Sequence, residues 1–450
     1  MQCDVAVVGG GVAGLLTAYR ILLSKPEWRV LVFEQAPVVG GRLRTGTFDK
    51  RDVVSGAGVG RLQKDTRLAS LLHELKVVEP AKLAVMVPLP KKPASQMQQQ
   101  QHQQDLLNKL RQRAKLLTAD NDVTFLEFAE STLGRLEARQ FVSKMGYTDM
   151  LHASARATMR FYGLEDNVSS WTPFAVPWNR LVDALQDAVN QANNNSKQDQ
   201  SKQDQSKQDQ SKHDRRRVWT NAKVTKLSKA VRGGFDLQVC TTKRALPIKS
   251  GSGCVQVHAR IVVLATPINV LKTLVPPELF NKSKLVHVKS QPWVRAYVKV
   301  AKQSRQAVAE AVQKYKVVYP NVLMKIREVD AAAGVYMAAY ADGPAALQLH
   351  KDHTLLRLQR LLTAALGFDV KLTAHKLFYH KHGTHYFTPH IRLTLAGATA
   401  TPDPNLHVVG EAVAAQQGWT EGALQSVEYV VKRLLTRSAR PTRTHLDTHL

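Results

Sequence analysis

The sequence predicts an α/β fold, in which a parallel sheet and its helices are joined to an α+β part built on an antiparallel sheet. Near the start of the chain, a β-branched run at residues 4–8 precedes a glycine-rich turn, an apolar helical stretch at 15–23 and a second strand at 29–33. Further on, several strand-like stretches between residues 285 and 395 surround a helix, which is typical of an antiparallel sheet. The chain has 450 residues. A single core stops growing at roughly 250–300 residues, so we expect two or more domains.

The turn after the first strand has the spacing of a dinucleotide-binding unit. Gly9, Gly11 and Gly14 form the pattern GxGxxG between a strand and a helix. Gly9 permits the tight turn, Gly11 lets the backbone approach a pyrophosphate, and Gly14 lets the helix pack on the strand. Glu34 ends the second strand, where its carboxylate can accept hydrogen bonds from a ribose. This context predicts a Rossmann-like unit with phosphates at the helix N-terminus.

A second glycine pair follows that a nicotinamide-binding unit does not need. Gly40 and Gly41 precede Arg42 and Arg44, and a further glycine-rich loop occupies residues 55–61. Glycines allow close backbone contact, and arginines supply fixed hydrogen-bond donors. These features predict a cofactor that has a second anionic or polar group. They also predict that the backbone of the loop at 55–61 lies close to a flat chemical group.

The middle of the chain is predicted to be mainly helical. Helical periodicity covers residues 105–117, 126–145 and 182–191. The glutamine-rich stretch at 94–108 is interpreted as a solvated loop that leads into a helix. Residues 193–214 contain the pentapeptide SKQDQ three times and part of a fourth copy, and we expect a low-complexity surface loop there.

The later segments supply the remaining strands. A strand at 406–409 runs into Gly410 and Glu411, and a glycine at 422 stands just before a helix at 423–435. A glycine and an acid after a strand, with a glycine at a helix start, indicate a second phosphate- or ribityl-binding unit. The other predicted strands are 218–224, 234–240, 255–265, 294–300, 315–319, 334–340 and 372–379, with a helix at 353–366.

Together these segments resemble the flavin-containing amine oxidase superfamily. The resemblance is carried by the GGGVAG turn with Glu34, by Gly40-Gly41-Arg42, and by the C-terminal GWTEGA segment at 418–423. Residues 383–387 and 417–424 are most similar to the uncharacterised amine-oxidase-like proteins of large DNA viruses. The resemblance implies FAD, bound without a covalent link, because His385 stands near the place of the cysteine that carries the flavin in some members.

The resemblance also implies a division of the chain and a set of cofactor contacts. Residues 1–80, 215–275 and 391–450 would form a discontinuous FAD-binding domain, and residues 81–192 and 276–390 a substrate-binding domain. The implied cofactor-binding residues are Gly9, Gly11, Val12, Ala13, Gly14, Glu34, Gln35, Gly41, Arg42, Gly58, Arg61, Val224, Thr266, Gly410, Glu411, Trp419, Gly422 and Ala423.

Four residues are candidates for a role in the reaction. Trp419 falls on one position of the family's aromatic cage, and Tyr386 is the candidate for the other. Arg295 stands where the family has a lysine that bonds a water molecule near the flavin, and Lys299 lies four residues on. An arginine can position water but cannot release its proton. Another departure is Pro177, which begins a segment where the family has glycines.

Composition restricts the class of protein and its partners. Lys and Arg total 63 and Asp and Glu total 36, a formal net charge of +27. Such a surface attracts polyanions, so non-specific nucleic-acid binding is a candidate, although no DNA-binding motif is visible. Three cysteines are too few for a disulfide framework, and we expect a reducing, cytoplasmic setting, or association with a virion if the source is viral. We expect a soluble protein without a transmembrane segment.

The sequence leaves three functions open. The first is an FAD-dependent amine oxidase that passes hydride from a small-molecule amine to flavin N5, with molecular oxygen as the oxidant and hydrogen peroxide as product. The second keeps FAD but performs desaturation or isomerisation, as in protoporphyrinogen oxidase. The third is a catalytically weak flavin-fold protein that binds nucleic acid through its basic surface.

Overall fold

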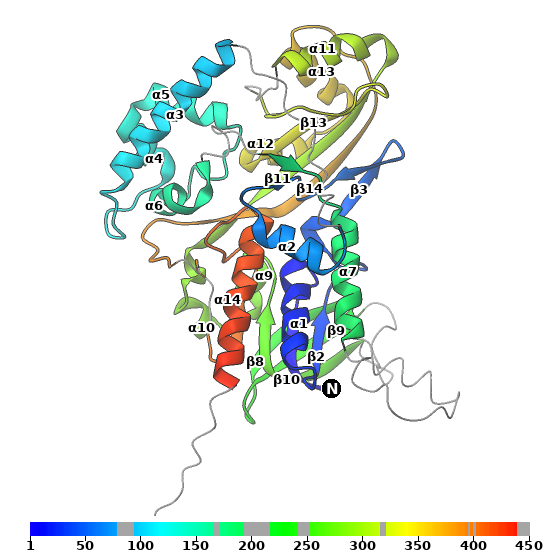
Figure 1. Ribbon diagram of the computed structural model, residues 1–450, viewed down its shortest axis with the longest axis vertical. Helices are drawn as coiled ribbons and strands as arrows, with labels where there is room; N and C mark the ends of the chain where they lie inside the picture. The colour runs from blue at the N-terminus through cyan, green and yellow to red at the C-terminus, as the bar shows by residue number, and fades with distance from the viewer. Residues whose placement is uncertain are drawn as a thin grey trace, which may run out of the picture.

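The computed structural model describes residues 1–78, 94–164, 172–192, 217–241, 253–315, 321–394, 397–398 and 402–438. The SKQDQ repeats at 193–214 therefore lie outside the described residues. Figure 1 shows a larger sheet with helices α1, α7 and α14 in the lower part of the molecule, and a second sheet and two groups of helices above it. Within the described part of the chain, no helix is both long and apolar enough to cross a membrane.

The larger sheet is mainly parallel, as the sequence predicts. Strands β1 (Gln2–Val8), β2 (Val30–Phe33) and β10 (Cys254–Leu264) run side by side, with Val5 opposite Val30 and Ile261. The order is β7-β2-β1-β10-β9-β8, with β15 (Leu406–Val408) paired to β10. The other strands are β7 (Val218–Trp219), β8 (Ala222–Lys229) and β9 (Phe235–Thr241), of which β8 and β9 are antiparallel. The predicted α/β class is confirmed.

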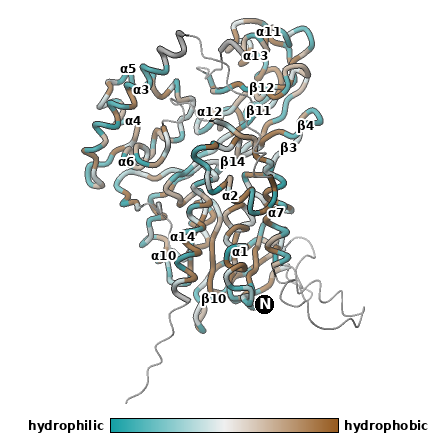
Figure 2. The backbone as a smooth tube through the Cα atoms, in the orientation of Figure 1, coloured by the Kyte–Doolittle hydropathy of each residue, from teal (hydrophilic) through white to brown (hydrophobic). Residues whose placement is uncertain are grey.

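Helices cover both faces of this sheet because its strands are apolar on both faces. Helices α1 (Val12–Ser24), α2 (Thr66–Glu74), α7 (Trp178–Gln191) and α14 (Thr420–Ser438) share one core with β1 and β2. Helices α9 (Ile268–Leu274) and α10 (Pro277–Asn281) contribute to the core on the other face. Figure 2 shows the hydrophobic colouring concentrated around α1 and β10.

The second sheet is antiparallel, also as predicted, with the order β12-β13-β11-β14. Its strands are β11 (Val288–Val300), β12 (Arg327–Asp330), β13 (Val335–Asp342) and β14 (Leu372–Phe387). Apolar side chains on one face pack with the helices α11 (Arg305–Tyr315), α12 (Gly343–Lys351) and α13 (Leu355–Leu366). The opposite face, with Tyr297, packs on the hairpin of β3 (Thr45–Phe48) and β4 (Arg51–Val54). The short strands β5 (Gly60–Arg61) and β6 (Pro173–Phe174) pair beside it.

The middle of the chain forms a helical group with its own core. It contains α3 (Ala94–Ala114), α4 (Phe125–Leu133), α5 (Arg135–Met145), α6 (Ala155–Ala157) and the π-helical turn η3 (Thr158–Tyr162). A capping box, in which Thr124 and Glu127 each bond the other's backbone N–H, starts α4.

Two local predictions are wrong. The glutamine-rich stretch at 94–108 is part of helix α3 and not a loop, because glutamine is a good helix former even when it is solvated. Tyr315, predicted to begin a strand, is the last residue of α11, and the rest of that predicted strand lies outside the described residues.

The division into two domains remains a proposal, and the structure suggests where to adjust it. The predicted boundary places residues up to 192 in the substrate-binding domain. Helix α7, however, packs through Leu181, Val182 and Leu185 into the same core as α1. We therefore propose that α7 belongs with the cofactor-binding part.

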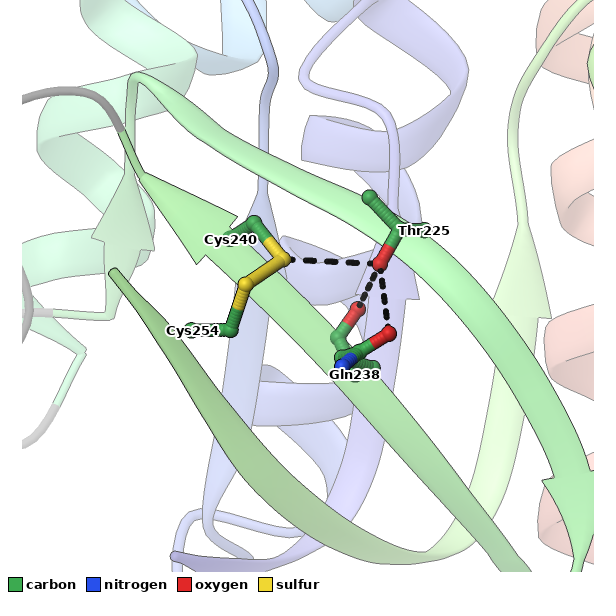
Figure 3. Close-up of a disulfide and its surroundings, with 4 residues drawn as sticks. All are labelled: Thr225, Gln238, Cys240 and Cys254. Atoms are coloured by element: carbon green, nitrogen blue, oxygen red, sulfur yellow. Dashed lines mark hydrogen bonds between the residues drawn. A yellow bond between two sulfur atoms is a disulfide. The ribbon is translucent and has the colours of Figure 1, made fainter. Parts of the chain in front are cut away.

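A disulfide joins β9 to β10, which the cysteine count did not lead us to expect. Cys240 and Cys254 are directly opposite each other in the two strands and are bonded, while Cys3 is free and buried. Thr225 on the neighbouring strand contacts the Cys240 sulfur (Figure 3). The low number of cysteines therefore no longer supports the expectation of a reducing compartment.

This bond gives a first testable prediction. It cross-links residues 14 apart in the sequence, so replacing both Cys240 and Cys254 with Ser should lower the free energy of unfolding by about 3 kcal/mol. Urea unfolding without reductant measures the loss. Wild-type protein with reductant should show the same loss, and equal stability of all three samples would contradict the prediction.

Candidate active site

The glycine turn between β1 and α1 combines tight packing with one open position. A Cβ atom at Gly14 would lie 1.9 Å from the Gly9 carbonyl oxygen, and one at Gly9 would lie 2.5 Å from the Ala265 oxygen. Gly9 also has φ of +107°, which favours glycine. A Cβ at Gly11, in contrast, would meet nothing within 4 Å. Gly9 and Gly14 therefore hold the turn against β10, while Gly11 leaves its outer face free for a ligand.

The N-terminus of α1 is suited to an anion. Gly11 is its N-cap residue, no side chain caps it, and its first turn contains no acidic residue. The first N–H groups of a helix have no partner within the helix and carry partial positive charge. The predicted contacts Val12 and Ala13 begin this helix, and both are buried.

The second glycine pair lies directly against the first turn. The Gly40 N–H donates to the Gly10 carbonyl at 2.8 Å, and a Cβ at Gly41 would lie 3.7 Å from the Gly11 Cα. Glu34 accepts from the N–H groups of Gly10 at 2.7 Å and Ala36 at 2.8 Å. These contacts bring Glu34 and Gly41 to the glycine turn as predicted, whereas Gln35 is exposed beside it.

A network joins the partly exposed Arg42 to the buried His385 and Glu411, which are far apart in the sequence. The Glu411 carboxylate accepts from Arg42 Nη1 at 2.8 Å, His385 Nδ1 at 2.6 Å and the N–H of Gly418 at 2.9 Å. Burial alone would raise the pKa of Glu411, but the charges and hydrogen bonds of His385 and Arg42 lower it well below its usual range. Glu411 therefore stays ionised and fixes the loop that leads to Trp419.

Trp419 is held by a buried arginine. The Arg61 guanidinium carbon lies 3.6 Å from the centroid of a Trp419 ring, and Arg61 forms a salt bridge with Asp65 at 2.5 Å. Arg61 has no exposed side-chain surface, while Trp419 is only half-buried. One ring face of Trp419 is therefore fixed by a cation, and part of the ring is accessible, unlike that of a core tryptophan.

The start of α14 packs closely on the same loop. A Cβ at Gly422 would lie 1.9 Å from the Gln416 carbonyl oxygen, and Ala423 is buried in the core with α1. The Gly410 N–H donates to Ser426 of this helix at 2.8 Å. The predicted positions Gly410, Gly422 and Ala423 therefore lie together, at a second helix N-terminus.

The structure says less about two of the predicted cofactor contacts, Thr266 and Val224. Thr266 follows β10 beside Gly9, and its hydroxyl has no hydrogen-bond partner among the described residues. Val224 is buried in the core on β8, so contact of its backbone with an adenine stays a prediction.

Of the four predicted reaction residues, two contact the loop at 55–61: Trp419 through Arg61, and Arg295 through Gly58. Arg295 is 4% exposed, and its Nη2 lies 3.1 Å from the position of a Cβ at Gly58. The Gly58 carbonyl accepts a hydrogen bond from Trp178 Nε1 at 2.8 Å. Trp178, in the segment where the family has glycines, therefore supports this loop. Arg295 therefore faces the loop at 55–61, where Gly58 and Arg61 are implied cofactor contacts.

Lys299 and Tyr386 are placed elsewhere. Lys299 is on the same face of β11 as Arg295, but its Nζ bonds Asp49 of the β3–β4 hairpin at 2.7 Å. Tyr386 follows His385, which points toward Glu411. Because successive side chains of a strand point to opposite faces, Tyr386 points away from the Trp419 loop. Neither residue is retained in the site proposed below.

Sequence reasoning missed an aromatic cluster beside Arg295. Trp293 covers Gly383, where a Cβ would lie 1.4 Å from the Trp293 Cδ1. The ring centroids of Trp293 and Tyr340 are 5.3 Å apart, and those of Tyr340 and Tyr147 are 5.7 Å apart. The Gly383 carbonyl accepts from Arg42 Nη1 at 2.6 Å, so the cluster adjoins the Arg42–Glu411 network. Only the alternation along β11 could have indicated that Trp293 shares a face with Arg295.

Two charged residues complete the cluster. Lys325 places its Nζ 3.0 Å from the Tyr147 ring centroid. Burial, and then the charge of Arg327, lower its pKa well below the usual value. Asp149 accepts from the Tyr162 hydroxyl and lies 4.0 Å from the position of a Cβ at Gly418. Burial, followed by the charge of Asp342, raises the pKa of Asp149 to about 7.

The shifted pKa of Asp149 predicts a pH-dependent stability. Between about pH 4 and 7 the folded state holds a proton on Asp149 that the unfolded chain releases. The stability that Asp149 contributes therefore falls as pH rises through 7. Relative to Asp149→Asn, wild type should lose roughly 4 kcal/mol of unfolding free energy between pH 4 and pH 8.

Denaturant unfolding of both proteins across this pH range measures the difference. The groups that face Asp149 are Tyr147, Tyr162, Lys325, Tyr340, Asp342 and Glu411. The difference between the two proteins therefore reports Asp149 together with its interaction with these groups. A constant difference between the two proteins would show that Asp149 has an ordinary pKa.

Comparisons with known proteins identify the family. Residues 12–435 match the family of flavin-containing amine oxidoreductases. Among solved structures, a triple mutant of putrescine oxidase with redesigned cofactor binding has a TM-score of 0.66 at 16% identity, covering 97% of this chain and 99% of that one. Wild-type putrescine oxidase bound to putrescine has a TM-score of 0.66 at 15% identity, covering 97% of this chain and 100% of that one. At these identities the likeness concerns the fold.

A curated relative matches a shorter segment. The uncharacterised protein R188 of Acanthamoeba polyphaga mimivirus is 29% identical over 79 residues, which is 17% of this chain and 16% of that protein. The matched segment thus spans about a sixth of the viral protein.

The observed residues fit the family's cofactor. An uncapped helix N-terminus with an open backbone face at Gly11, an acid at the end of β2, and a second helix N-terminus beside a fixed tryptophan are the features that a dinucleotide with a second ring system requires. The chain belongs to the flavin-containing amine oxidoreductase family and is an FAD-dependent, amine-oxidase-like oxidoreductase.

Proposed function

We propose that the protein oxidises a small-molecule amine, with transfer of hydride from the carbon next to the nitrogen to flavin N5, and with molecular oxygen as the final oxidant and hydrogen peroxide as product. The observation that supports this most is the position of Trp419. It is half-buried, stacked on a buried arginine, and tied through Gly418 to the Glu411 network. FAD supplies the hydride acceptor, and the chain supplies binding and orientation.

The chain would hold the cofactor at two helix N-termini. The N–H groups at the start of α1 would bind the pyrophosphate, and Glu34 would exchange its bond to Gly10 for the ribose hydroxyls. Arg42 would lie between the pyrophosphate and the ribityl chain. The N-terminus of α14, at Gly422 and Ala423, would face the edge of the ring on which negative charge develops during reduction.

The amine would lie between Trp419 and the aromatic cluster. Trp293 takes the space that a side chain at 383 would fill, so we propose Trp293 in place of Tyr386 as the second aromatic wall. Arg295, beside Gly58, would hold a water molecule or a substrate atom through its N–H groups and would not accept a proton. The site thus requires the amine to be neutral when it reacts.

The likeness of residues 383–387 and 417–424 to amine-oxidase-like proteins of large DNA viruses stays part of this proposal. The structure favours neither a desaturase nor a nucleic-acid-binding function, and the experiment below separates both from amine oxidation.

Anaerobic titration of the purified yellow protein with a panel of amines tests the proposal. At least one amine should bleach the visible absorbance of the flavin, and admission of oxygen should restore it with release of hydrogen peroxide. A flavoprotein that no amine reduces would contradict amine oxidation and leave desaturation as the alternative. Substrate-independent binding of DNA with a steep salt dependence would favour the third function.

Substitution of two glycines separates cofactor binding from folding. Gly11→Ala should fold with near wild-type stability, because the new methyl group meets nothing, yet it should weaken FAD binding by about tenfold or more by blocking close approach of the pyrophosphate. Gly14→Ala should instead destabilise the fold, because its methyl group would collide with the Gly9 carbonyl. Equilibrium dialysis of FAD and thermal unfolding of the apoprotein measure the two effects. Equal FAD affinity of Gly11→Ala and wild type would place the cofactor elsewhere.

Trp419 offers a direct test of the aromatic wall. Trp419→Ala should lower the rate of anaerobic flavin reduction by an amine by roughly 2- to 30-fold while FAD stays bound, since such aromatic contacts are worth about 0.5–2 kcal/mol. Trp419→Phe keeps a ring face for Arg61 and is the matched control. Loss of FAD from Trp419→Ala, with normal flavin in Trp419→Phe, would show that the ring supports the cofactor pocket instead.

A further inference from the structure

An open cleft lies at the turn of the β3–β4 hairpin, at the opposite end of the hairpin from the loop at 55–61 (Figure 1). Its volume is about 570 Å³, and it is lined by Asp49, Lys50, Arg51, Lys299, Arg305 and Ala333. Pockets for small molecules typically measure roughly 300–1,000 Å³. The cleft is therefore large enough for a small molecule, and Lys299, which is not part of the proposed amine site, belongs to its wall.

The cleft has more positive than negative charge. Asp49 accepts from Lys299 Nζ at 2.7 Å and from Arg51 Nη1 at 2.9 Å, and Asp330 accepts from Arg51 Nη2 at 2.9 Å. The hydrogen bond from Lys299 lowers the pKa of Asp49, so this carboxyl group stays ionised. Four cations line the cleft and two carboxylates bond them, which leaves a net charge of +2.

Lys50 and Arg305 carry the unbalanced charge. Within the part of the chain that the structure describes, neither forms a salt bridge. Arg305 donates from Nη1 to the Ala332 carbonyl at 3.0 Å and from Nε to the Val300 carbonyl at 3.4 Å. Gly334 gives it room, since a Cβ there would lie 2.7 Å from Arg305 Nε. The guanidinium is therefore fixed by backbone carbonyls, while its charge has no carboxylate to balance it among the described residues.

The turn that carries Lys50 departs from the usual residue preference. Phe48 pairs with Arg51, so Asp49 and Lys50 form a two-residue turn. Both have left-handed backbone conformations, with φ of +48° and +62°, as in a type I′ turn. Aspartate is common at the first position of this turn, whereas the second strongly prefers glycine. Strained residues of this kind are typical of ligand-binding sites, and here the strain places a cation at the cleft.

We propose that this cleft binds a small phosphorylated molecule, at a site separate from those of FAD and the amine. A phosphate dianion would balance the charges of Lys50 and Arg305. The planar guanidinium of Arg305 suits phosphate oxygens, and the ammonium groups of Lys50 and Lys299 have further donors to offer. The volume of the cleft favours a small molecule over a nucleic-acid chain.

Inorganic pyrophosphate is the probe, and the protein is used with FAD bound, so that the turn at Gly11 is already occupied. Isothermal titration calorimetry should show one site, whose affinity falls as salt is added. Lys50→Gly should weaken pyrophosphate binding by about threefold or more, because it removes a partly solvated cation. It should leave the melting temperature unchanged or higher, because glycine fits the turn.

Lys76→Gly is the matched control. Lys76 is also an exposed lysine with a left-handed backbone, at φ of +53°, but it does not line the cleft. The substitution therefore removes the same charge and the same kind of strain, and this variant should bind pyrophosphate as wild type does. Arg305→Gln, which removes the fixed guanidinium, should weaken binding by about tenfold or more.

Three outcomes would overturn the proposal. They are no pyrophosphate binding by the wild-type holoprotein, equal affinity of wild type and Lys50→Gly, and an equal loss in Lys76→Gly, which would indicate general attraction to the basic surface. Binding of a short DNA duplex that Lys50→Gly weakens, without binding of pyrophosphate, would also overturn it in favour of nucleic acid. If Arg305→Gln does not fold, Lys50→Gly decides. No amine is present, so failure of amine oxidation would leave this test unaffected.

Discussion

The Glu411 carboxylate is the contact on which the site depends. It joins Arg42 after the second glycine pair, His385 on β14 and Gly418 before Trp419. These residues come from three distant parts of the sequence, so their meeting requires both sheets to be in place. Removing one partner of a buried charge pair typically costs about 3–5 kcal/mol, which makes this network a structural link between the two sheets as well as a part of the cofactor site.

The parts of the fold that were predictable are those that a local pattern specifies. The GxGxxG turn and the strands on either side of α1 follow from residue type and spacing, and the packing of Gly9 and Gly14 explains why no other residue fits there. The first half of the helix at 94–114 was missed because glutamine gives little hydrophobic periodicity yet favours helix, whereas its second half was predicted. The disulfide was missed because pairing depends on strand register, which the sequence does not show.

The candidate site was predictable on its cofactor side and much less on its substrate side. Arg42, Glu411 and Trp419 stand in recognisable motifs. Trp293, Tyr147, Asp149 and Lys325 stand in none, and only the fold brings them together. Tyr386 was chosen from the local resemblance of residues 383–387, and Lys299 because it shares a strand face with Arg295. Strand alternation turns Tyr386 away from the Trp419 loop, and Asp49 binds Lys299. The excess positive charge of the chain also has one buried member, Arg295, which lies beside the aromatic cluster.

The central claim is that one continuous site runs from the glycine turn at Gly11 to the tryptophan at 419. A crystal structure of the FAD-bound protein tests it most directly. The account predicts the pyrophosphate at the N-terminus of α1, the ring system between Gly58 and Trp419, and the salt bridge of Arg42 with Glu411 intact. A flavin ring remote from Trp419, or a protein that crystallises with FAD away from Gly11, would contradict it.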